Sequence, residues 1–106
     1  MNQNFISALR SVADDIEAGT LKPGRKQICN FDGSPCCAIG HVIARAKGFA
    51  IVDSYEPWYE GVDVDLNTPD DCHPFVIWEP NDSGDWPGTV AALRKVADIL
   101  AARTDA

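Results

Sequence analysis

Apolar residues recur at helical spacing near both ends of the chain, and this pattern constrains the fold more than any other feature. The first stripe consists of Phe5, Ile6, Leu9, Val12, Ala13 and Ile16. The second stripe follows Pro87 and consists of Val90, Leu93, Val96, Ala97 and Leu100. Spacings of three and four residues place each set on one face of a 3.6-residue helix. The sequence therefore predicts an amphipathic helix at each end, the first one ending at Gly19 and the last one beginning at Asp85 or Trp86.

A further helix is predicted between these two. Ser34 is a favourable N-cap, Pro35 suits the first helical position, and Gly48 suits a left-handed C-terminal residue. The helix is expected to run from about Cys36 to Lys47. Its apolar face would consist of Ile39, Val42, Ile43 and Ala46.

Four short segments have the composition or alternation of β-strands. They are Ile28–Phe31, Phe49–Val52, Val62–Leu66 and Phe75–Trp78, and the last of these is followed by a predicted loop over Glu79–Asp85. We therefore expect an α+β fold, with an N-terminal helix, a second helix after a short hairpin-like segment, a small antiparallel sheet and a C-terminal helix. The length of 106 residues and the lack of a linker predict a single domain over residues 1–106.

Composition limits the classes of function. The 45% hydrophobic content is typical of a globular chain, and no apolar run approaches the roughly 18 residues of a membrane helix. No basic segment followed by an apolar stretch stands at the N-terminus, so we expect a cytoplasmic protein without a secretory signal. The net charge of -7 argues against nucleic acid as a direct ligand, because phosphate binding requires a cationic surface.

The charges are distributed unevenly along the chain. No Lys or Arg occurs between Gly48 and Leu93, whereas that segment contains most of the acids and most of the aromatic residues. One interpretation is a solvated acidic face above an aromatic core. The other is a binding surface for a basic protein, because aromatic side chains provide contact area and acids steer the encounter. The residues predicted to contact the partner are Trp58 and Tyr59 as anchors, with Asp63, Asp65, Asp70 and Asp71 as an acidic rim.

The cysteines and histidines suggest a zinc site as one alternative. Cys29, Cys37, His41 and Cys72 are ligand types that zinc prefers, and Cys37 and His41 would share a helix face. No closely spaced Cys pair of the zinc-finger type is present. Buried thiols in a reducing compartment are the simpler interpretation, so no cofactor is predicted and zinc remains an alternative.

A cysteine hydrolase is a second alternative. Cys37 would lie at a helix N-terminus, where the helix dipole lowers a thiol pKa, and His73 would be the base. Asn81 or Asp82 would orient that base. The order of the three residues is similar to that of small papain-like hydrolases, although the flanking signature of that class is missing.

Two short motifs resemble a family of short uncharacterised proteins from actinobacteria and phages. Cys37-Ala38-Ile39-Gly40 resembles the family's Cys-Ala-x-Gly helix start, and Trp78 with Asn81-Asp82 resembles its Trp-Asn-Asp run. Glu79-Pro80 interrupts that run here, and His41 stands where the family tends to have Ala. The resemblance implies a phage or mobile-element origin and assigns no catalytic residue.

These observations lead to one functional prediction. The chain is expected to be a small acidic phage-type protein that binds a basic host protein surface. Anti-CRISPR proteins, which inhibit nucleic-acid-guided defence systems, are similar in size and charge, so inhibition of such a system is the predicted role.

Overall fold

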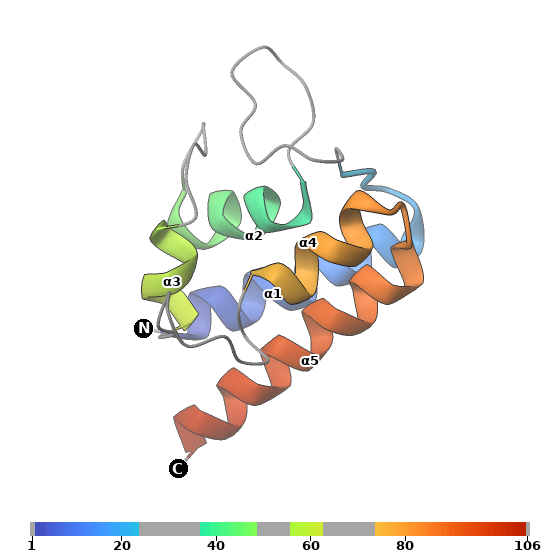
Figure 1. Cartoon of the computed structure of the whole chain (residues 1–106). Helices are drawn as coiled ribbons and strands as arrows, with labels where there is room; N and C mark the ends of the chain where they lie inside the picture. Colours follow the sequence, from blue (N-terminus) through green and yellow to red (C-terminus); the bar gives the residue numbers. More distant parts are fainter. Residues whose placement is uncertain (1, 24–36, 49–55, 63–73, 106) are drawn as a thin grey trace.

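The computed structural model describes residues 2–23, 37–48, 56–62 and 74–105, and these ranges contain five helices (Figure 1). The helices are α1 (Asn2–Ala18), α2 (Ala38–Lys47), α3 (Glu56–Val62), α4 (Phe75–Asp82) and α5 (Trp86–Asp105). Across these ranges the structure contains no β-strand.

The two terminal helices α1 and α5 pack against each other along their length and run in opposite directions (Figure 1). Two ion pairs show the antiparallel direction. Arg10 of α1 contacts Asp98 of α5 at 3.3 Å, and Asp14, one turn later in α1, contacts Arg94, one turn earlier in α5, at 2.9 Å. Helix α2 packs on α1, and α4 packs on α5 and α2. The short α3 lies beside the N-terminal end of α1 (Figure 1).

The core lies between these helices, and both predicted stripes supply it. All eleven apolar residues of the two stripes are buried, which confirms the terminal amphipathic helices. Helix α2 adds its buried apolar face, α3 adds Trp58 and α4 adds Ile77. The Trp58 ring meets the Phe5 ring edge to face, with centroids 6.3 Å apart. Burial of this apolar surface is the main force that holds the helices together.

The helix ends confirm most of the predicted boundaries. Gly19 and Gly48 have φ values of 79° and 74°, and each follows the last residue of its helix. The Asp85 carboxylate accepts a 3.0 Å hydrogen bond from the Gly88 N–H, an N-cap contact at the start of α5. A Cβ at Gly88 would clash with the Asp85 carboxylate, so a larger residue there would displace the capping group.

The predicted start of α2 was wrong. The helix begins at Ala38, and Cys37 occupies the N-cap position with an extended backbone and no side-chain capping bond. The predicted N-cap Ser34, with Pro35, lies outside the described residues. A thiol is a weak hydrogen-bond acceptor. The first N–H group of α2 instead donates to the Asn81 side chain of α4.

The predicted α+β fold with an antiparallel sheet was also wrong. Phe75–Trp78, the segment most typical of a strand, forms the first half of α4, and the first four residues of the expected loop complete that helix, while residues 83–85 connect it to α5. Pro74 stands at the start with φ -58°, and its carbonyl accepts the N–H groups of Ile77 and Trp78 at 3.0 Å. Packing of α4 on α2 and α5 therefore prevails over the β-propensity of an aromatic and β-branched run.

The other predicted strands receive no support from the described residues. Val62, the expected first residue of one strand, is the last residue of α3. The remainder of that segment, as well as Ile28–Phe31 and Phe49–Val52, lies outside the described residues.

Candidate protein-binding face on helix α4

The inner face of α4 is attached to the start of α2 by a buried asparagine. Asn81 has no exposed surface, and its Oδ1 atom accepts a 3.0 Å hydrogen bond from the Ala38 N–H. Ala38 is the first residue of α2, so Asn81 performs the capping that the Cys37 thiol does not. The Asn81 Nδ2 atom also donates to the Asp82 Oδ1 atom at 3.3 Å. The Asn81 side chain thus connects α4 to α2 and also contacts the Asp82 carboxylate.

The outer face of α4 carries aromatic and acidic side chains in one stripe. Phe75, Trp78, Glu79 and Asp82 stand at spacings of three and four residues, on the side opposite the buried Ile77 and Asn81. Phe75 is 47% exposed, the largest exposure among the big apolar side chains of the described residues. We call these four residues the α4 face.

The two rings of the α4 face are held in a defined arrangement. The Phe75 and Trp78 centroids are 5.9 Å apart, and the ring planes meet at 86°. An edge-to-face pair of this kind is favoured by the ring quadrupoles, so the aromatic surface is ordered before any partner arrives. Trp78 is half-buried and packs on the core, which anchors the pair.

The sequence segment that contains the α4 face is acidic. Glu79 and Asp85 are exposed and Asp82 is half-buried, while no Lys or Arg occurs anywhere between Gly48 and Leu93. The chain therefore presents apolar rings together with negative charge on the same helix. Such a surface is chemically matched to a partner that is basic and also offers apolar contact area.

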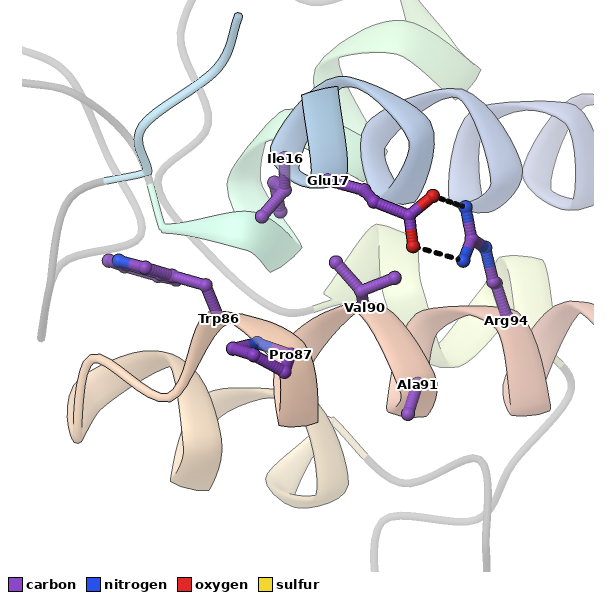
Figure 2. Close-up of a pocket in the computed structure, with 7 residues that line it drawn as sticks. All are labelled: Ile16, Glu17, Trp86, Pro87, Val90, Ala91 and Arg94. Atoms are coloured by element: carbon purple, nitrogen blue, oxygen red, sulfur yellow. Dashed lines mark hydrogen bonds and ion pairs between the residues drawn. The ribbon is translucent and has the colours of Figure 1, made fainter. Parts of the chain in front are cut away.

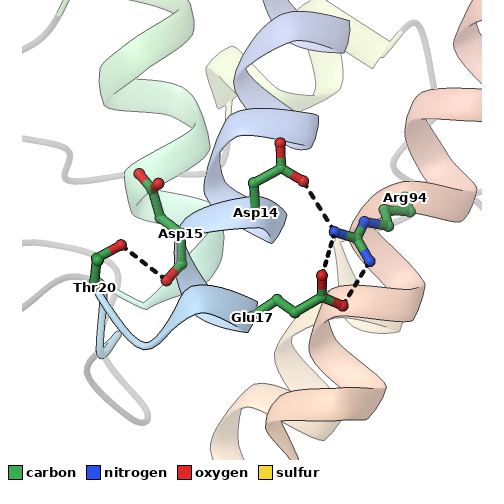
Figure 3. Close-up of polar contacts among 5 residues, drawn as sticks. All are labelled: Asp14, Asp15, Glu17, Thr20 and Arg94. Atoms are coloured by element: carbon green, nitrogen blue, oxygen red, sulfur yellow. Dashed lines mark hydrogen bonds and ion pairs between the residues drawn. The ribbon is translucent and has the colours of Figure 1, made fainter.

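Three arginines of the described helices, Arg10, Arg45 and Arg94, form ion pairs within the fold. Arg94 of α5 donates to both oxygens of Glu17, at 2.9 and 3.1 Å, and also to Asp14 at 2.9 Å (Figure 3). The hydrogen bonds from Arg94 lower the pKa of the Glu17 carboxyl below its ordinary value, and the two carboxylates raise the pKa of Arg94. Arg45 of α2 contacts Asp15 of α1 at 2.9 Å. These contacts hold α1 to its neighbours and belong to the scaffold.

A cavity of about 390 Å³ lies between the end of α1 and the start of α5 (Figure 2). Its lining residues are Ile16, Glu17, Trp86, Pro87, Val90, Ala91 and Arg94. The walls are mainly apolar, and the Glu17–Arg94 pair lies along one side (Figure 2). Among the described residues, the lining supplies no thiol, hydroxyl or imidazole group, and its mainly apolar walls can accommodate an apolar group.

The structure corrects one of the predicted partner contacts. Trp58 was predicted as an exposed anchor, but its side chain has no exposed surface and packs in the core against Phe5. Tyr59 lies within α3. The four predicted rim residues, Asp63, Asp65, Asp70 and Asp71, lie outside the described residues.

The sequence contained a signal for the α4 face that its strand-like composition obscured. The spacing of Phe75, Trp78, Glu79 and Asp82 is that of one helix face, but the apolar run Phe75–Trp78 favoured a strand. A proline directly before an apolar segment was the cue that pointed to a helix start.

The proposed cysteine hydrolase and zinc sites are only partly covered by the described residues. Cys37 is 98% buried at the start of α2, and the chain brings Asn81 to the adjacent Ala38. The expected base His73 lies outside the described residues, so their arrangement as a catalytic group stays a prediction.

The zinc alternative is also only partly covered by the described residues. Cys37 and His41 are one turn apart, and the His41 N–H donates to the Cys37 carbonyl at 3.1 Å. Cys29 and Cys72 lie outside the described residues, and the described part of the chain holds no group of three His, Cys, Asp or Glu side chains placed to bind a metal.

Among the described residues, no helix has both the length and the apolar character needed to cross a membrane.

Comparison with known proteins leaves the chain without a family assignment. No family model matches the sequence, and neither the curated proteins nor the solved structures include a significant match. The resemblance to short actinobacterial and phage proteins therefore stays a prediction.

Proposed function

We propose that this protein is a binding module whose α4 face docks on a basic surface of a protein partner. The observation that carries the proposal is the stripe of Phe75, Trp78, Glu79 and Asp82 on one side of a helix that is fixed to the core by its other side. The stripe lies in a long segment without Lys or Arg.

The two kinds of side chain have different roles in this proposal. The Phe75–Trp78 pair provides contact area, because aromatic rings bury much surface and lose little conformational entropy. The carboxylates of Glu79 and Asp82 steer the encounter and select against acidic partners. Affinity should therefore decrease when salt is added.

A host protein that handles nucleic acid is the partner class that this chemistry fits best. Such proteins present basic surfaces to phosphates, and an acidic module could occupy the same surface. Together with the net charge of -7, this supports an inhibitor of phage or mobile-element origin, comparable in role to anti-CRISPR proteins.

Charge reversal on α4 tests the proposal. The double variant Glu79→Lys/Asp82→Lys should abolish capture of partners from a host lysate at low salt, whereas Glu56→Lys/Glu60→Lys should retain capture. Glu56 and Glu60 are matched controls because both are exposed acids on α3, away from α4, and the double change alters the net charge by the same amount (Figure 1). Capture that is equal for wild type and the α4 variant, or unchanged between low and high salt, would contradict the proposal.

A further inference from the structure

We infer that the α4 face recognises arginine side chains of the partner in preference to lysine side chains. This inference rests on the proposed function, and it names the chemical group that the α4 face selects. Three features of the α4 face support it: the aromatic pair, the carboxylates on the same side of the helix, and the hydrogen bond from the buried Asn81 to one of those carboxylates.

The aromatic pair provides a surface for a planar cation. Phe75 is 47% exposed, and the neighbouring Trp78 ring stands nearly perpendicular to it at 86°. A guanidinium group can stack on the face of an aromatic ring, and tryptophan gives the strongest cation–π interaction. Ring edges carry partial positive charge, so the cation is expected on an exposed ring face and not at a ring edge.

The carboxylates stand where a stacked guanidinium needs acceptors. Glu79 is one turn from Phe75, and Asp82 is one turn from Trp78, so each ring has a carboxylate beside it on the same side of the helix. A guanidinium presents several N–H donors in one plane and can donate two of them to a single carboxylate. Stacking and paired hydrogen bonding can therefore occur together.

Asn81 prepares one of these carboxylates for binding. Its Nδ2 atom donates to the Asp82 Oδ1 atom at 3.3 Å, while its Oδ1 atom is held by the Ala38 N–H at 3.0 Å. Because Asn81 is completely buried, this contact restricts the orientation of Asp82. A carboxylate that is already oriented loses less entropy when a partner binds.

Lysine satisfies these features less well. Its ammonium group is compact and strongly hydrated, and it cannot form the planar, paired contact with a carboxylate. Losing the stack and the second hydrogen bond should weaken binding by about fivefold per engaged side chain. The selectivity depends on the rings and on the paired hydrogen bonds, whereas the negative charge of the carboxylates attracts any cation.

Two matched peptides test the inference with the full-length protein. One is a short, fluorescently labelled arginine-rich peptide, and the other is the same peptide with every arginine replaced by lysine. In anisotropy titrations at low salt, the arginine peptide should bind at least about fivefold tighter. Trp78→Leu should weaken binding of the arginine peptide more than binding of the lysine peptide and so reduce this ratio toward one, and Glu79→Gln/Asp82→Asn should weaken both peptides.

The outcomes separate the inference from the proposed function. Equal affinity for the two peptides in the wild type would overturn the preference for arginine and leave a general binder of basic surfaces. Absence of binding to either peptide would contradict both. Because Trp78 is half-buried, far-UV circular dichroism must show that Trp78→Leu is folded, and Phe75→Leu, at a more exposed position, provides a second variant that should also lower the ratio.

Discussion

Asn81 shows how much structure a single side chain can determine. Its amide oxygen caps α2 from a position 43 residues further along the chain, and its amide nitrogen contacts Asp82 on the α4 face. A buried N–H group without a partner is costly, so the start of α2 depends on α4 being in place. The same residue was predicted from the sequence to orient a catalytic histidine, but the described contacts assign it a capping role.

Replacement of Asn81 should reveal this dependence. We expect Asn81→Ala to lower the free energy of unfolding by about 1–3 kcal/mol, because the Ala38 N–H becomes buried without an acceptor. Urea denaturation monitored by circular dichroism measures the change. Asn4→Ala, which alters an exposed asparagine of α1, should change stability by less than about 0.5 kcal/mol. Similar values for the two variants would show that the capping contact does not stabilise the fold.

At the scale of elements, the contact between α1 and α5 combines buried apolar side chains with an ion pair between Arg94 and Glu17. The Arg94 guanidinium contacts both Glu17 oxygens and also Asp14, all near the end of the first helix (Figure 3). Its hydrogen bonds lower the pKa of Glu17 in the folded chain. A carboxyl with a lowered pKa stabilises the fold above its unfolded pKa, and this contribution is lost as pH falls through the folded pKa.

Removing the arginine should therefore affect Glu17 in a defined direction. In Arg94→Gln, the pKa of Glu17 should rise toward its ordinary value, which a nuclear magnetic resonance titration of the side-chain carboxyl measures. The stability difference between wild type and variant should be largest near neutral pH and shrink in acid. Arg10→Gln, which breaks a different contact between α1 and α5, should leave the pKa of Glu17 unchanged. An unchanged pKa in Arg94→Gln would contradict this account.

Helix α4 shows why element type was harder to predict than element position. The run Phe75–Trp78 has the composition of a strand, and Pro80 stands inside the helix that forms. Intrinsic propensity amounts to a fraction of a kcal/mol per residue, whereas burying Ile77 against neighbouring helices contributes more. The terminal helices were predictable because their stripes extend over several turns and local propensity agrees with packing.

At the scale of the whole molecule, the aromatic residues of the acidic segment divide into two sets. Trp58 is fully buried against Phe5 of α1, while Phe75 and Trp78 form the surface of α4. The aromatic core of the first interpretation is confirmed for Trp58, whereas the binding surface of the second stays a prediction, which we now assign to Phe75 and Trp78. Composition alone could not assign each ring, because burial depends on contacts between helices that are distant in the sequence.

This division predicts opposite effects of two truncations. Trp58→Ala should destabilise the protein by about 3–5 kcal/mol, because it leaves a large cavity in the core. Phe75→Ala should cost about 1 kcal/mol or less, since nearly half of that ring is already exposed to water, and it should weaken partner binding instead. Thermal or urea unfolding of both variants checks the difference. A Trp58→Ala protein as stable as Phe75→Ala would place Trp58 outside the essential core.

The sequence by itself determined the two terminal amphipathic helices, the glycine ends of α1 and α2, and the acidic, aromatic character of the middle of the chain. These features depend on neighbouring residues and on composition, so they can be read without knowing the fold. Tertiary structure decided that residues 75–82 are helical, that Asn81 caps α2, and which aromatic rings reach the surface. Each of these depends on free energy gained between segments far apart in sequence, which no local pattern contains.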